Sequence, residues 1–576
     1  MSDTTLSAVP DKGLNTGVRG RANYQWFRTY PKSIDWYAEL KPEPLPDVLD
    51  RTVRDYGDLT CTYFMGAKLS YRDIGALVDK AAKGLQEIGV KKGMRVGLLL
   101  PNIPYFPIMY YAILKAGGTV VNFNPLYTVE EITHQVKDSG TSIMVTLDLS
   151  ALFPKLEALL ASGALERAIV CPFAKALPGL KGTLFKLLKS KELAKLDASP
   201  HRAKIITYEK LTANDGKYTR VPLDVSDIAV LQYTGGTTGT PKGAMLTHAN
   251  LSVNLQQSDL WEMHVEKGAD RIMAILPFFH VFAMTTIMNR GISNAAMLIL
   301  VPRFDINMVL TLLRETRPTV MPGVPTLFNA LRNHPKLKPE DLKSLRSGVS
   351  GGAPLPIELK RNFEKEAGVI LVEGYGLSET SPVATCNPLD GPVKEGSIGL
   401  PLPRTIISLR SLEDPAVEVP LGEKGEICIA GPQVMKGYWN KPEDTKAAFV
   451  GEFFRTGDVA TMDEDGFTYI VDRIKDLILC SGYNVYPRRI EEAIYQHPAV
   501  EEVTVVGIPD AYRGEAPKAF VKLRAGQNAD KAELLKFLQA KLSKIEMPSQ
   551  IEFRDELPKT MVGKLSKKEL RAEKAN

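Results

Sequence analysis

Short apolar segments alternate with amphipathic segments over the first several hundred residues of this chain. Residues 95–101 (RVGLLLP), 119–125 (TVVNFNP) and 142–148 (SIMVTLD) have the pattern of buried strands, and residues 105–118 and 128–140 between them have helical spacing of apolar side chains. Strands that are apolar on both faces and alternate with helices are typical of parallel sheets covered by helices on both sides. The alternation therefore predicts an α/β fold.

Two changes of pattern divide the chain. From about residue 400 to 470, strands follow one another with turn signals and no long helix, which predicts a smaller antiparallel or barrel-like unit. After residues 472–476 (DRIKD) a new alternation predicts a compact α+β unit. Because 576 residues exceed what one hydrophobic core usually serves, we expect an N-terminal domain at 1–471, a hinge at 472–476 and a C-terminal domain at 477–576.

Composition excludes several classes of protein. A net charge of +5 on 63.4 kDa is too small for a dedicated nucleic-acid surface, so we expect no nucleic-acid partner. The five cysteines are scattered and contain no C-x-x-C pair, which favours a reducing compartment and gives no zinc spacing. The N-terminus lacks an apolar signal region, and the longest apolar stretch is short for a bilayer span. We expect a cytoplasmic protein, at most peripheral on the inner face of the membrane.

Residues 177–196 (LPGLKGTLFKLLKSKELAKL) do not fit the α/β alternation. Their leucines have helical spacing and are surrounded by lysines. A basic amphipathic helix of this kind can lie in an anionic membrane interface. A solvated surface helix packed through its leucines is the other interpretation, and the sequence leaves both open.

Residues 231–251 (LQYTGGTTGTPKGAMLTHANL) concentrate glycines, threonines and one lysine at a single turn. Glycines let backbone N–H groups approach an anion, and threonine hydroxyls add donors for phosphate oxygens. The spacing is not that of Walker A, because Pro241 precedes Lys242 and Gly243 follows it. We expect a phosphate-binding loop that connects a strand to a helix with Thr247 near its start.

This segment resembles the phosphate loop of the adenylate-forming superfamily, which includes acyl-CoA synthetases, luciferases and peptide-synthetase adenylation domains. Further similar motifs follow in the family's order over nearly the whole chain: 276–284 (LPFFHVFAM), 350–355 (SGGAPL), 374–382 (GYGLSETSP), 454–460 (FRTGDVA), 472–491 (DRIKDLILCSGYNVYPRRIE) and 558–564 (PKTMVGK). Residues 100–106 and 122–140 resemble the long-chain fatty-acyl-CoA ligases of bacteria within that superfamily.

The resemblance implies a fold and a reaction. The N-terminal domain should contain two mainly parallel sheets with helices and a small β-barrel-like subdomain, followed by a mobile α+β C-terminal domain. The reaction should join a fatty acid to CoA through an acyl-adenylate, with ATP, Mg²⁺ and CoA as co-substrates and AMP and pyrophosphate as products.

The resemblance also assigns nucleotide contacts by motif position. The ATP phosphates should contact Thr234, Gly235, Gly236, Thr237, Thr238, Gly239, Thr240 and Lys242. Glu379 should bind Mg²⁺, which usually takes one or two carboxylates plus phosphate oxygens. Asp458 and Arg473 should contact the ribose hydroxyls. The adenine slot should consist of Gly352, Ala353, Gly374, Tyr375 and Gly376.

Three further roles depend on the C-terminal motifs. Lys564 should bridge the carboxylate and the α-phosphate and neutralise the transition state, although its basic tail alone is typical of a solvated charge run. Lys475 should be the pivot of the hinge, and Gly482 should line the pantetheine tunnel for CoA. Since Lys564 should be exposed when the domains open, we also expect it to be a target for a lysine acetyltransferase.

Several alternatives remain at this stage. His280 is either a gate between the acyl and nucleotide pockets or a histidine packed among core aromatics. Medium-chain, dicarboxylic and aromatic acids compete with long-chain fatty acids as substrates. A non-catalytic, membrane-associated nucleotide-binding protein and a peptide-synthetase adenylation module are rival functions. A serine hydrolase is disfavoured, because prolines follow the G-x-S-x-G match at 348–352 where a helix should begin.

Overall fold

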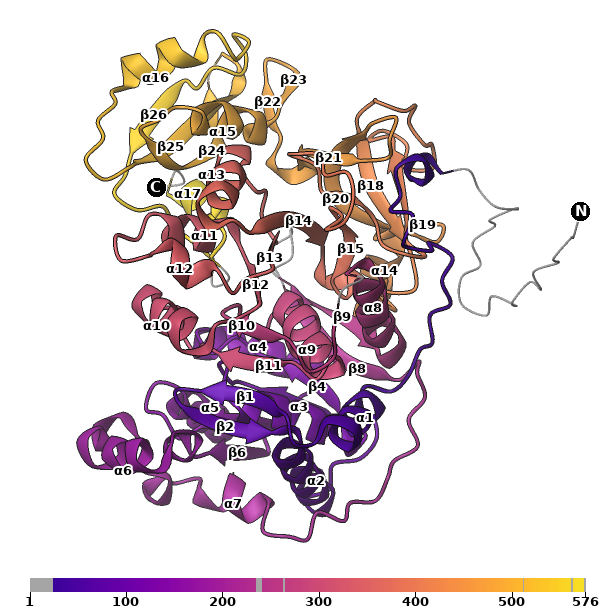
Figure 1. Cartoon of the computed structure of the whole chain (residues 1–576), viewed down its shortest axis with the longest axis vertical. Helices are drawn as coiled ribbons and strands as arrows, with labels where there is room; N and C mark the ends of the chain where they lie inside the picture. Colours follow the sequence, from indigo (N-terminus) through magenta and orange to yellow (C-terminus); the bar gives the residue numbers. More distant parts are fainter. Residues whose placement is uncertain (1–23, 235–240, 263–264, 511, 561–562, 574–576) are drawn as a thin grey trace, which may run out of the picture.

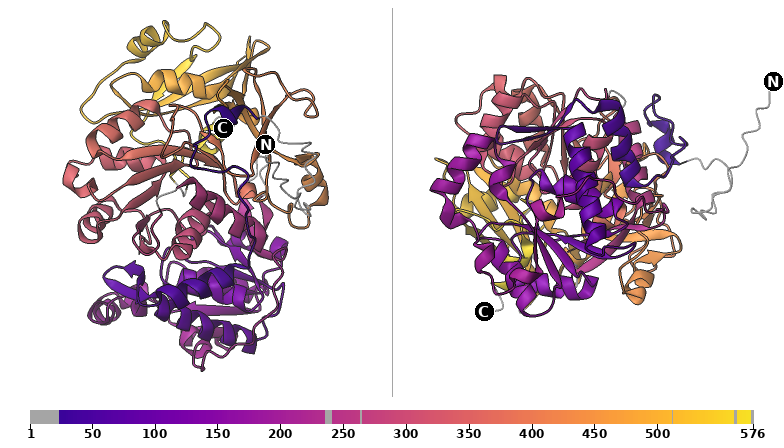
Figure 2. Two further views of the ribbon diagram at one scale, coloured as in Figure 1. Left: turned by 45° about the vertical axis from the view of Figure 1, so that its right-hand side comes forward. Right: turned by 90° about the horizontal axis from the view of Figure 1, so that it is seen from below.

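The computed structural model describes residues 24–234, 241–262, 265–510, 512–560 and 563–573. Two sheets with their helices form the lower and central parts of the molecule in Figure 1, and a smaller antiparallel sheet lies beside them. The C-terminal unit lies at the end opposite the first sheet, as Figure 2 also shows. The predicted α/β class and the separate α+β unit are confirmed.

The first sheet is parallel except at its last strand pair. Its order over the described residues is β7 (Ile205–Thr207), β6 (Arg167–Cys171), β5 (Ile143–Leu147), β3 (Arg95–Leu98), β4 (Thr119–Asn122), β8 (Ile228–Thr234) and β9 (Lys242–Thr247). Helices cross between these strands: α3 (Tyr105–Lys115), α4 (Val129–Ser139) and α5 (Phe153–Ala161). Strands β4 and β5 are buried at every residue, as strands covered on both faces must be.

One expectation about the phosphate loop is wrong. The loop does not connect a strand to a helix but joins two antiparallel strands, β8 and β9, which pair Thr234 with Lys242. Residues Lys242–Thr247 form a largely buried strand, β9, which lies between the loop and the helix and adds an antiparallel edge to the sheet. Thr247 is the N-cap of α8 (His248–Trp261), and its hydroxyl accepts from Asn250 N, so that part of the expectation is confirmed.

The second sheet contributes the strands around the site. Its order within the described residues is β16 (Leu400–Pro401), β15 (Val383–Cys386), β14 (Ile370–Gly376), β13 (Ser347–Gly351), β12 (Val320–Gly323), β10 (Arg271–Ala274), β11 (Met297–Leu300), β1 (Thr60–Phe64) and β2 (Ala67–Ser70). The strands from β14 to β1 run parallel, so the carboxyl ends of β12, β13 and β14 meet at one edge.

Helices cover both faces and edges of this sheet. They are α1 (Leu45–Tyr56), α2 (Tyr71–Glu87), α9 (Arg290–Ser293), α10 (Ile306–Thr316), α11 (Pro325–Arg332), α12 (Pro339–Leu342) and α13 (Ile357–Ala367), in addition to α8.

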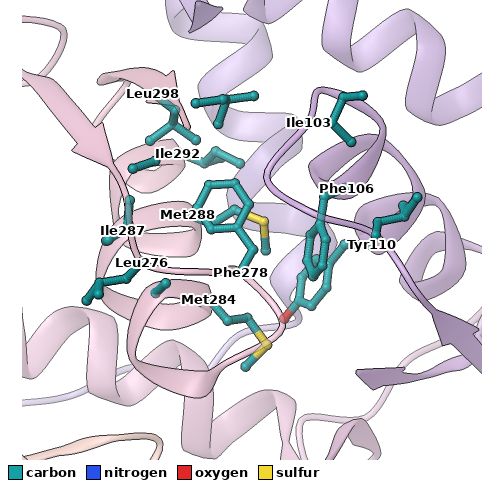
Figure 3. Close-up of a cluster of buried hydrophobic side chains, with 14 of the residues drawn as sticks. Ile103, Phe106, Tyr110, Leu276, Phe278, Met284, Ile287, Met288, Ile292 and Leu298 are labelled. Carbon is teal, nitrogen blue, oxygen red and sulfur yellow. The ribbon is translucent and has the colours of Figure 1, made fainter. Parts of the chain in front are cut away.

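A shared hydrophobic core joins the two sheets. Helix α3 of the first sheet packs against η6 (Ala283–Asn289), a π-helix of the second, and Figure 3 shows Phe106 and Tyr110 facing Phe278 and Met284. The rings of Phe106 and Phe278 meet edge to face, with centroids 5.6 Å apart. Inside this core the buried Asn289 accepts from Tyr111 Oη at 3.0 Å and donates to Tyr110 Oη at 3.1 Å. The aromatic residues of α3 therefore determine how η6 and the segment before it are placed.

The unit predicted near residues 400–470 is a five-stranded antiparallel sheet. Its strands are β17 (Ile406–Arg410), β18 (Gly425–Ala430), β20 (Phe453–Met462), β19 (Phe449–Val450) and β21 (Thr468–Arg473), the last paired with β20. Helix α14 (Pro442–Ala447) precedes β19, and the 3₁₀ turn η8 (Ile474–Asp476) follows β21.

The C-terminal unit has its own core and sheet. The sheet order is β23 (Tyr483–Val485), β22 (Ile478–Cys480), β25 (Gly514–Leu523) and β24 (Val500–Asp510), with β26 (Gln550–Phe553) parallel to β25. Helices α15 (Pro487–Tyr495), α16 (Lys531–Leu538) and α17 (Lys567–Ala572) complete it. Its core packs separately from those of the sheets before it, as expected for a unit that moves as a body.

The basic amphipathic segment forms helix α6 (Gly179–Leu188). Its Phe185 ring packs on Phe173, with centroids 4.9 Å apart, whereas Leu180, Leu187 and Leu188 are 77%, 70% and 76% exposed. The leucines therefore do not pack the helix onto the protein. In the part of the chain that the structure describes, no helix has both the length and the apolar composition needed to cross a bilayer.

We predict that Asn289→Ala destabilises the N-terminal domain by about 2 kcal/mol, because the buried Tyr111 hydroxyl would lose its acceptor and a small cavity would remain. Calorimetry should show a lower melting temperature. Asn307→Ala, on the exposed face of α10, is the matched control and should leave the melting temperature almost unchanged. An equal shift for both variants would contradict the assigned role of Asn289.

Candidate active site

A cavity of about 1420 Å³ lies where the two large sheets, the antiparallel sheet and the C-terminal unit meet. The expected site residues along its wall are Thr234, Lys242, His280, Gly352, Gly374, Tyr375, Gly376, Glu379, Arg473, Lys475 and Lys564. Residues up to 330 positions apart in the sequence are thus brought to one cavity, from Thr234 to Lys564. Its wall has a polar part and an apolar part.

The two residues that flank the expected phosphate loop, Thr234 and Lys242, lie at the polar part of the wall. Thr234 and Lys242 line the cavity from the facing ends of β8 and β9. The Lys242 ammonium forms an ion pair with Asp444 and lies 5.3 Å from the centre of the Tyr438 ring. The expected contacts Gly235, Gly236, Thr237, Thr238, Gly239 and Thr240 lie outside the described residues.

Glu379 lies directly after β14, in the 3₁₀ turn η7 (Ser378–Thr380). Its side chain is almost fully buried and accepts a hydrogen bond from Tyr438 Oη at 2.9 Å. Burial raises the pKa of this carboxyl above its usual range, and the Tyr438 hydrogen bond opposes the rise. The carboxylate is thus held in one orientation, in a turn that contacts β8 and β9.

Asp458, on β20, joins three elements through its two carboxylate oxygens. Oδ2 accepts from Tyr375 Oη at 2.7 Å, and Oδ1 forms an ion pair with Arg473 Nε at 2.9 Å. Asp458 is 2% exposed and is not itself part of the cavity wall, although both partners are. Each oxygen retains one lone pair for another donor. Tyr375 and Arg473 are therefore fixed by the same carboxylate.

The glycines at the carboxyl ends of β13 and β14 keep the cavity open. A Cβ on Gly376 would lie 1.8 Å from Pro382 O, so no other residue fits the tight approach of β14 to β15. Gly352 has φ +78°, and a Cβ there would lie 2.9 Å from Lys564 Cε. Gly374 lines the cavity beside Tyr375, whereas Ala353 follows Gly352 outside the wall.

The side chain of Lys564 crosses from the C-terminal unit to the end of β13. Burial, together with the Arg473 cation, lowers its pKa to about 8, while Asp458 opposes that change. A partly buried ammonium near another cation favours an incoming anion.

His280 lines the cavity. Burial, with the Lys564 cation nearby, lowers the pKa of the imidazole to about 3, so the ring is neutral. Its Nδ1 accepts from Phe282 N at 3.3 Å. The geometry makes His280 a neutral wall residue rather than an acid at physiological pH.

The two remaining expected residues occupy different places. Lys475, in η8, lines the cavity, and burial lowers its pKa with help from Arg473. Gly482 has φ +81° in the turn between β22 and β23, where Leu479 and Tyr483 are 57% and 62% exposed. This hairpin does not line the cavity. The structure thus brings Lys564 to the site and keeps the hairpin of Gly482 outside it.

One face of the second sheet forms the apolar part of the wall. From the carboxyl ends inward it presents first Gly351 and Gly374, then Val349, Val372 and Pro322, then Val320 and Ile272. Each layer lies two residues before the previous one, as residues on one face of a strand do. The lining then ends at Asp270, where charged side chains begin.

A cluster of ion pairs forms that far end. Arg290 Nε contacts Asp259 Oδ1 at 2.8 Å, and Arg290 Nη1 contacts Glu262 Oε2 at 2.8 Å. Arg346 Nη2 contacts Asp270 Oδ1 at 2.6 Å. Arg290, Glu262 and Asp270 line the cavity, so its apolar wall stops at charged groups that already have partners.

Several site residues were missed from the sequence. Tyr438 and Asp444, which hold Glu379 and Lys242, come from the segment around α14, where residues 436–439 pair with β9. Arg290 and Glu262 at the far end were missed as well. A tyrosine in a turn or an arginine on a short helix carries no local signal of this kind, so only the fold identifies them.

Comparisons with known proteins agree with this geometry. The family model described as AMP-binding enzyme matches residues 49–439, and the one described as AMP-binding enzyme C-terminal domain matches residues 489–564. A long-chain-fatty-acid–CoA ligase of Bacillus subtilis is 43% identical over 548 residues, which cover 95% of this chain and 97% of that protein. The corresponding ligase of Escherichia coli is 38% identical over 557 residues, covering 95% and 98%.

A solved structure also has this arrangement of domains. ATP-bound MatB from Rhodopseudomonas palustris superposes with a TM-score of 0.80 at 29% identity, over 92% of this chain and 98% of that one. The predicted resemblance to the adenylate-forming superfamily is confirmed, and the chain belongs to the AMP-binding enzyme family.

Proposed function

We propose that this protein is an AMP-forming acid–thiol ligase that joins a long-chain fatty acid to CoA. A carboxylate oxygen of the acid attacks the α-phosphorus of ATP and pyrophosphate leaves, which gives an acyl-adenylate. The CoA thiol then loses its proton and attacks the acyl carbonyl, the bond between the acyl carbon and the phosphate oxygen breaks, and AMP leaves. The kinship with long-chain-fatty-acid–CoA ligases over 95% of the chain supports this assignment.

The observation that carries the proposal is the single cavity that joins a cationic, hydrogen-bonding part to a long apolar face. Lys564 and Arg473, which is paired with Asp458 behind the wall, lie at one end, and the valine-lined sheet face begins next to them at Gly351. A nucleotide and an acyl chain would meet at that junction. Lys564 would neutralise charge that develops on the α-phosphate, while neutral His280 would separate the two halves.

Glu379 fits the expected role of Mg²⁺ ligand. Its buried carboxylate, oriented by Tyr438 beside the phosphate loop, supplies the one oxygen ligand that Mg²⁺ needs when phosphates and water supply the rest. When bound, the metal would neutralise phosphate charge. Thr234 and Lys242 would hold the β- and γ-phosphates, and Gly352, Gly374, Gly376 and Tyr375 would enclose the adenine.

The length of the apolar face supports a long-chain substrate. From Gly351 to Asp270 the lining spans six residues of strand, about 20 Å at roughly 3.3 Å per residue. An alkyl zigzag with bonds of about 1.5 Å advances roughly 1.3 Å per bond, so this distance matches an acid of about sixteen carbons. The ion pairs of Arg290 and Arg346 at the far end disfavour both longer chains and an unpaired second carboxylate.

The decisive experiment is acid-dependent pyrophosphate release by the purified chain, measured with and without CoA over a panel of octanoate, palmitate, a long dicarboxylate and benzoate. The proposal expects palmitate to be preferred, and acyl-CoA to form only with CoA present. Nucleotide binding without release for any acid would instead support a non-catalytic protein. Product retained on the enzyme with no transfer to CoA would support a carrier-dependent module.

For the second half-reaction we propose domain alternation. Residues 1–471 and 477–576 would be the two domains, and they would turn about 472–476 with Lys475 as pivot. Lys564 would leave the cavity and the Gly482 turn would replace it to admit pantetheine. The exposed position of that hairpin while Lys564 occupies the site is in agreement with this proposal.

We predict that kcat/KM for adenylation falls as pH rises through about 8, because the Lys564 ammonium in the free enzyme then loses its proton. Below that pH the ammonium is charged and the rate should be highest. Lys564→Arg is the control, since a guanidinium stays charged and its slower profile should be flat over the same range. A wild-type profile that is flat through pH 9 would contradict this role.

Acetylation of Lys564 would remove the same charge, and we propose it as a regulatory modification. Lys564→Gln, which mimics it, should slow acid-dependent pyrophosphate release by roughly a hundredfold or more. Full adenylation activity in Lys564→Gln would refute the modification as a switch.

We predict that Val349→Phe shifts the preference toward shorter acids, because the added ring would fill the middle of the apolar face. The kcat/KM for palmitate should fall at least about tenfold while that for octanoate changes little. Ile370→Phe, on the neighbouring strand but outside the wall and 48% exposed, is the matched control. Equal losses for both acids would show that the substitution damages the fold rather than the acyl site.

We also propose that helix α6 binds an anionic membrane surface. Its exposed leucines would enter the interface, and Lys181, Lys186, Lys189 and Lys191 lie in the same segment to attract lipid headgroups. The double variant Leu187→Glu/Leu188→Glu should reduce sedimentation with phosphatidylglycerol vesicles more than tenfold, since each buried leucine contributes about 2 kcal/mol. Val417→Glu, at a site 53% exposed on the small sheet unit, is the control. Unchanged binding by the double variant would exclude α6.

A further inference from the structure

The loop that carries Lys564 has its own internal hydrogen bonds. Thr560 N donates to Lys564 O at 2.6 Å, Gly563 N donates to Thr560 O at 2.8 Å, and Lys564 N donates to Thr560 Oγ1 at 3.2 Å. Residues Lys559 and Leu565 pair across the base of the turn. These bonds fix the shape of the turn, but they do not fix Lys564 relative to the nucleotide site.

A threonine of the N-terminal domain supplies that second constraint. Thr326 Oγ1, in the first turn of α11, donates a hydrogen bond of 2.6 Å to Gly563 O, the carbonyl directly before Lys564. Gly563 has φ +82°, and a Cβ there would lie 3.0 Å from Thr326 Oγ1 and 3.2 Å from Val324 Cγ2. The glycine thus permits the close approach that the hydrogen bond requires.

Helix α11 is a rigid support for this contact. It follows β12 directly, and its Leu327 and Phe328 are buried in the core of the second sheet. The Thr326 hydroxyl is therefore fixed to the sheet whose carboxyl ends form the site. Because Gly563 directly precedes Lys564, the hydrogen bond from Thr326 to Gly563 also positions the Lys564 ammonium relative to the sheet.

We propose that Thr326 is a positioning residue that holds the Lys564 loop in the adenylate-forming arrangement and acts in that half-reaction alone. This inference rests on the proposed function. When the C-terminal domain turns to bring the Gly482 hairpin to the cavity, Gly563 must move away from α11 and the bond must break. Thr326 then has no partner on the loop, so it cannot assist thioester formation.

The test separates the two half-reactions in the full-length protein. Formation of palmitoyl-adenylate from palmitate and ATP is followed in a single turnover, and conversion of supplied palmitoyl-adenylate with CoA is followed separately. Thr326→Val preserves the shape but removes the hydroxyl, and it should slow the first step by about twofold to tenfold, the range for one net hydrogen bond. The second step should keep its wild-type rate.

Conservative and remote variants guard against a merely structural effect. Thr326→Ser keeps the hydroxyl and should restore the first step, whereas Thr311→Val, on the exposed face of α10, should change neither step. Gly563→Ala, which pushes the loop from α11, should reproduce the loss in the first step even if Thr326→Val folds poorly.

The outcomes are distinct for the function and for the inference. If the wild-type enzyme forms no palmitoyl-adenylate, the proposed substrate and reaction fail. If the wild type is active and Thr326→Val adenylates at its full rate, or loses both steps equally, or is not rescued by serine, the positioning role is overturned while the function stands.

Discussion

The rest of the site depends on the charge of the Lys564 ammonium, which lies where the C-terminal unit meets the end of β13. The ammonium is partly buried near the Arg473 cation, and both effects lower its pKa and so destabilise the charged form. Asp458 balances this only in part, because its two oxygens already bind Tyr375 and Arg473. An anionic group at the end of β13 relieves the imbalance. The arrangement is therefore prepared for charge that arrives with a ligand or develops during a reaction.

The architecture explains why a polar and an apolar half share one cavity. Parallel strands end together, so the turns after β13 and β14 gather Gly352, Tyr375 and Glu379 at one edge. The same strands, followed inward, present valines and a proline on one face. Helices α8 and α9, with Glu262 directly after α8, contribute the ion pairs that end this face. The reactive end and the acyl site are thus both built on the sheet region of β10, β12, β13 and β14, which fixes the distance between them.

Much of this could be predicted from the sequence, and the failures have a physical pattern. Apolar strands and amphipathic helices have local periodicity, so the sequence predicts them. Short motifs likewise identify the site residues Thr234, Lys242, Glu379 and Lys564. Partners such as Tyr438 for Glu379, Asp444 for Lys242 and Gly563 for Thr326 lie 59, 202 and 237 residues away. Such pairs depend on tertiary packing. Strand β9 between the loop and α8 was missed for a similar reason, because it is a strand by virtue of its pairing with β8.

The ion pair between Lys242 and Asp444 gives the polar end of the cavity an internal counter-ion. The Lys242 ammonium is not an unpaired charge, because the Asp444 carboxylate neutralises it. A monovalent anion has little to gain by competing with that internal counter-ion. A triphosphate carries several charges and contacts neighbouring donors at the same time, so it would be able to replace Asp444 as the partner of Lys242. An anion that binds Lys242 would therefore have to displace the Asp444 carboxylate, which would favour a polyvalent anion over ordinary cellular salts.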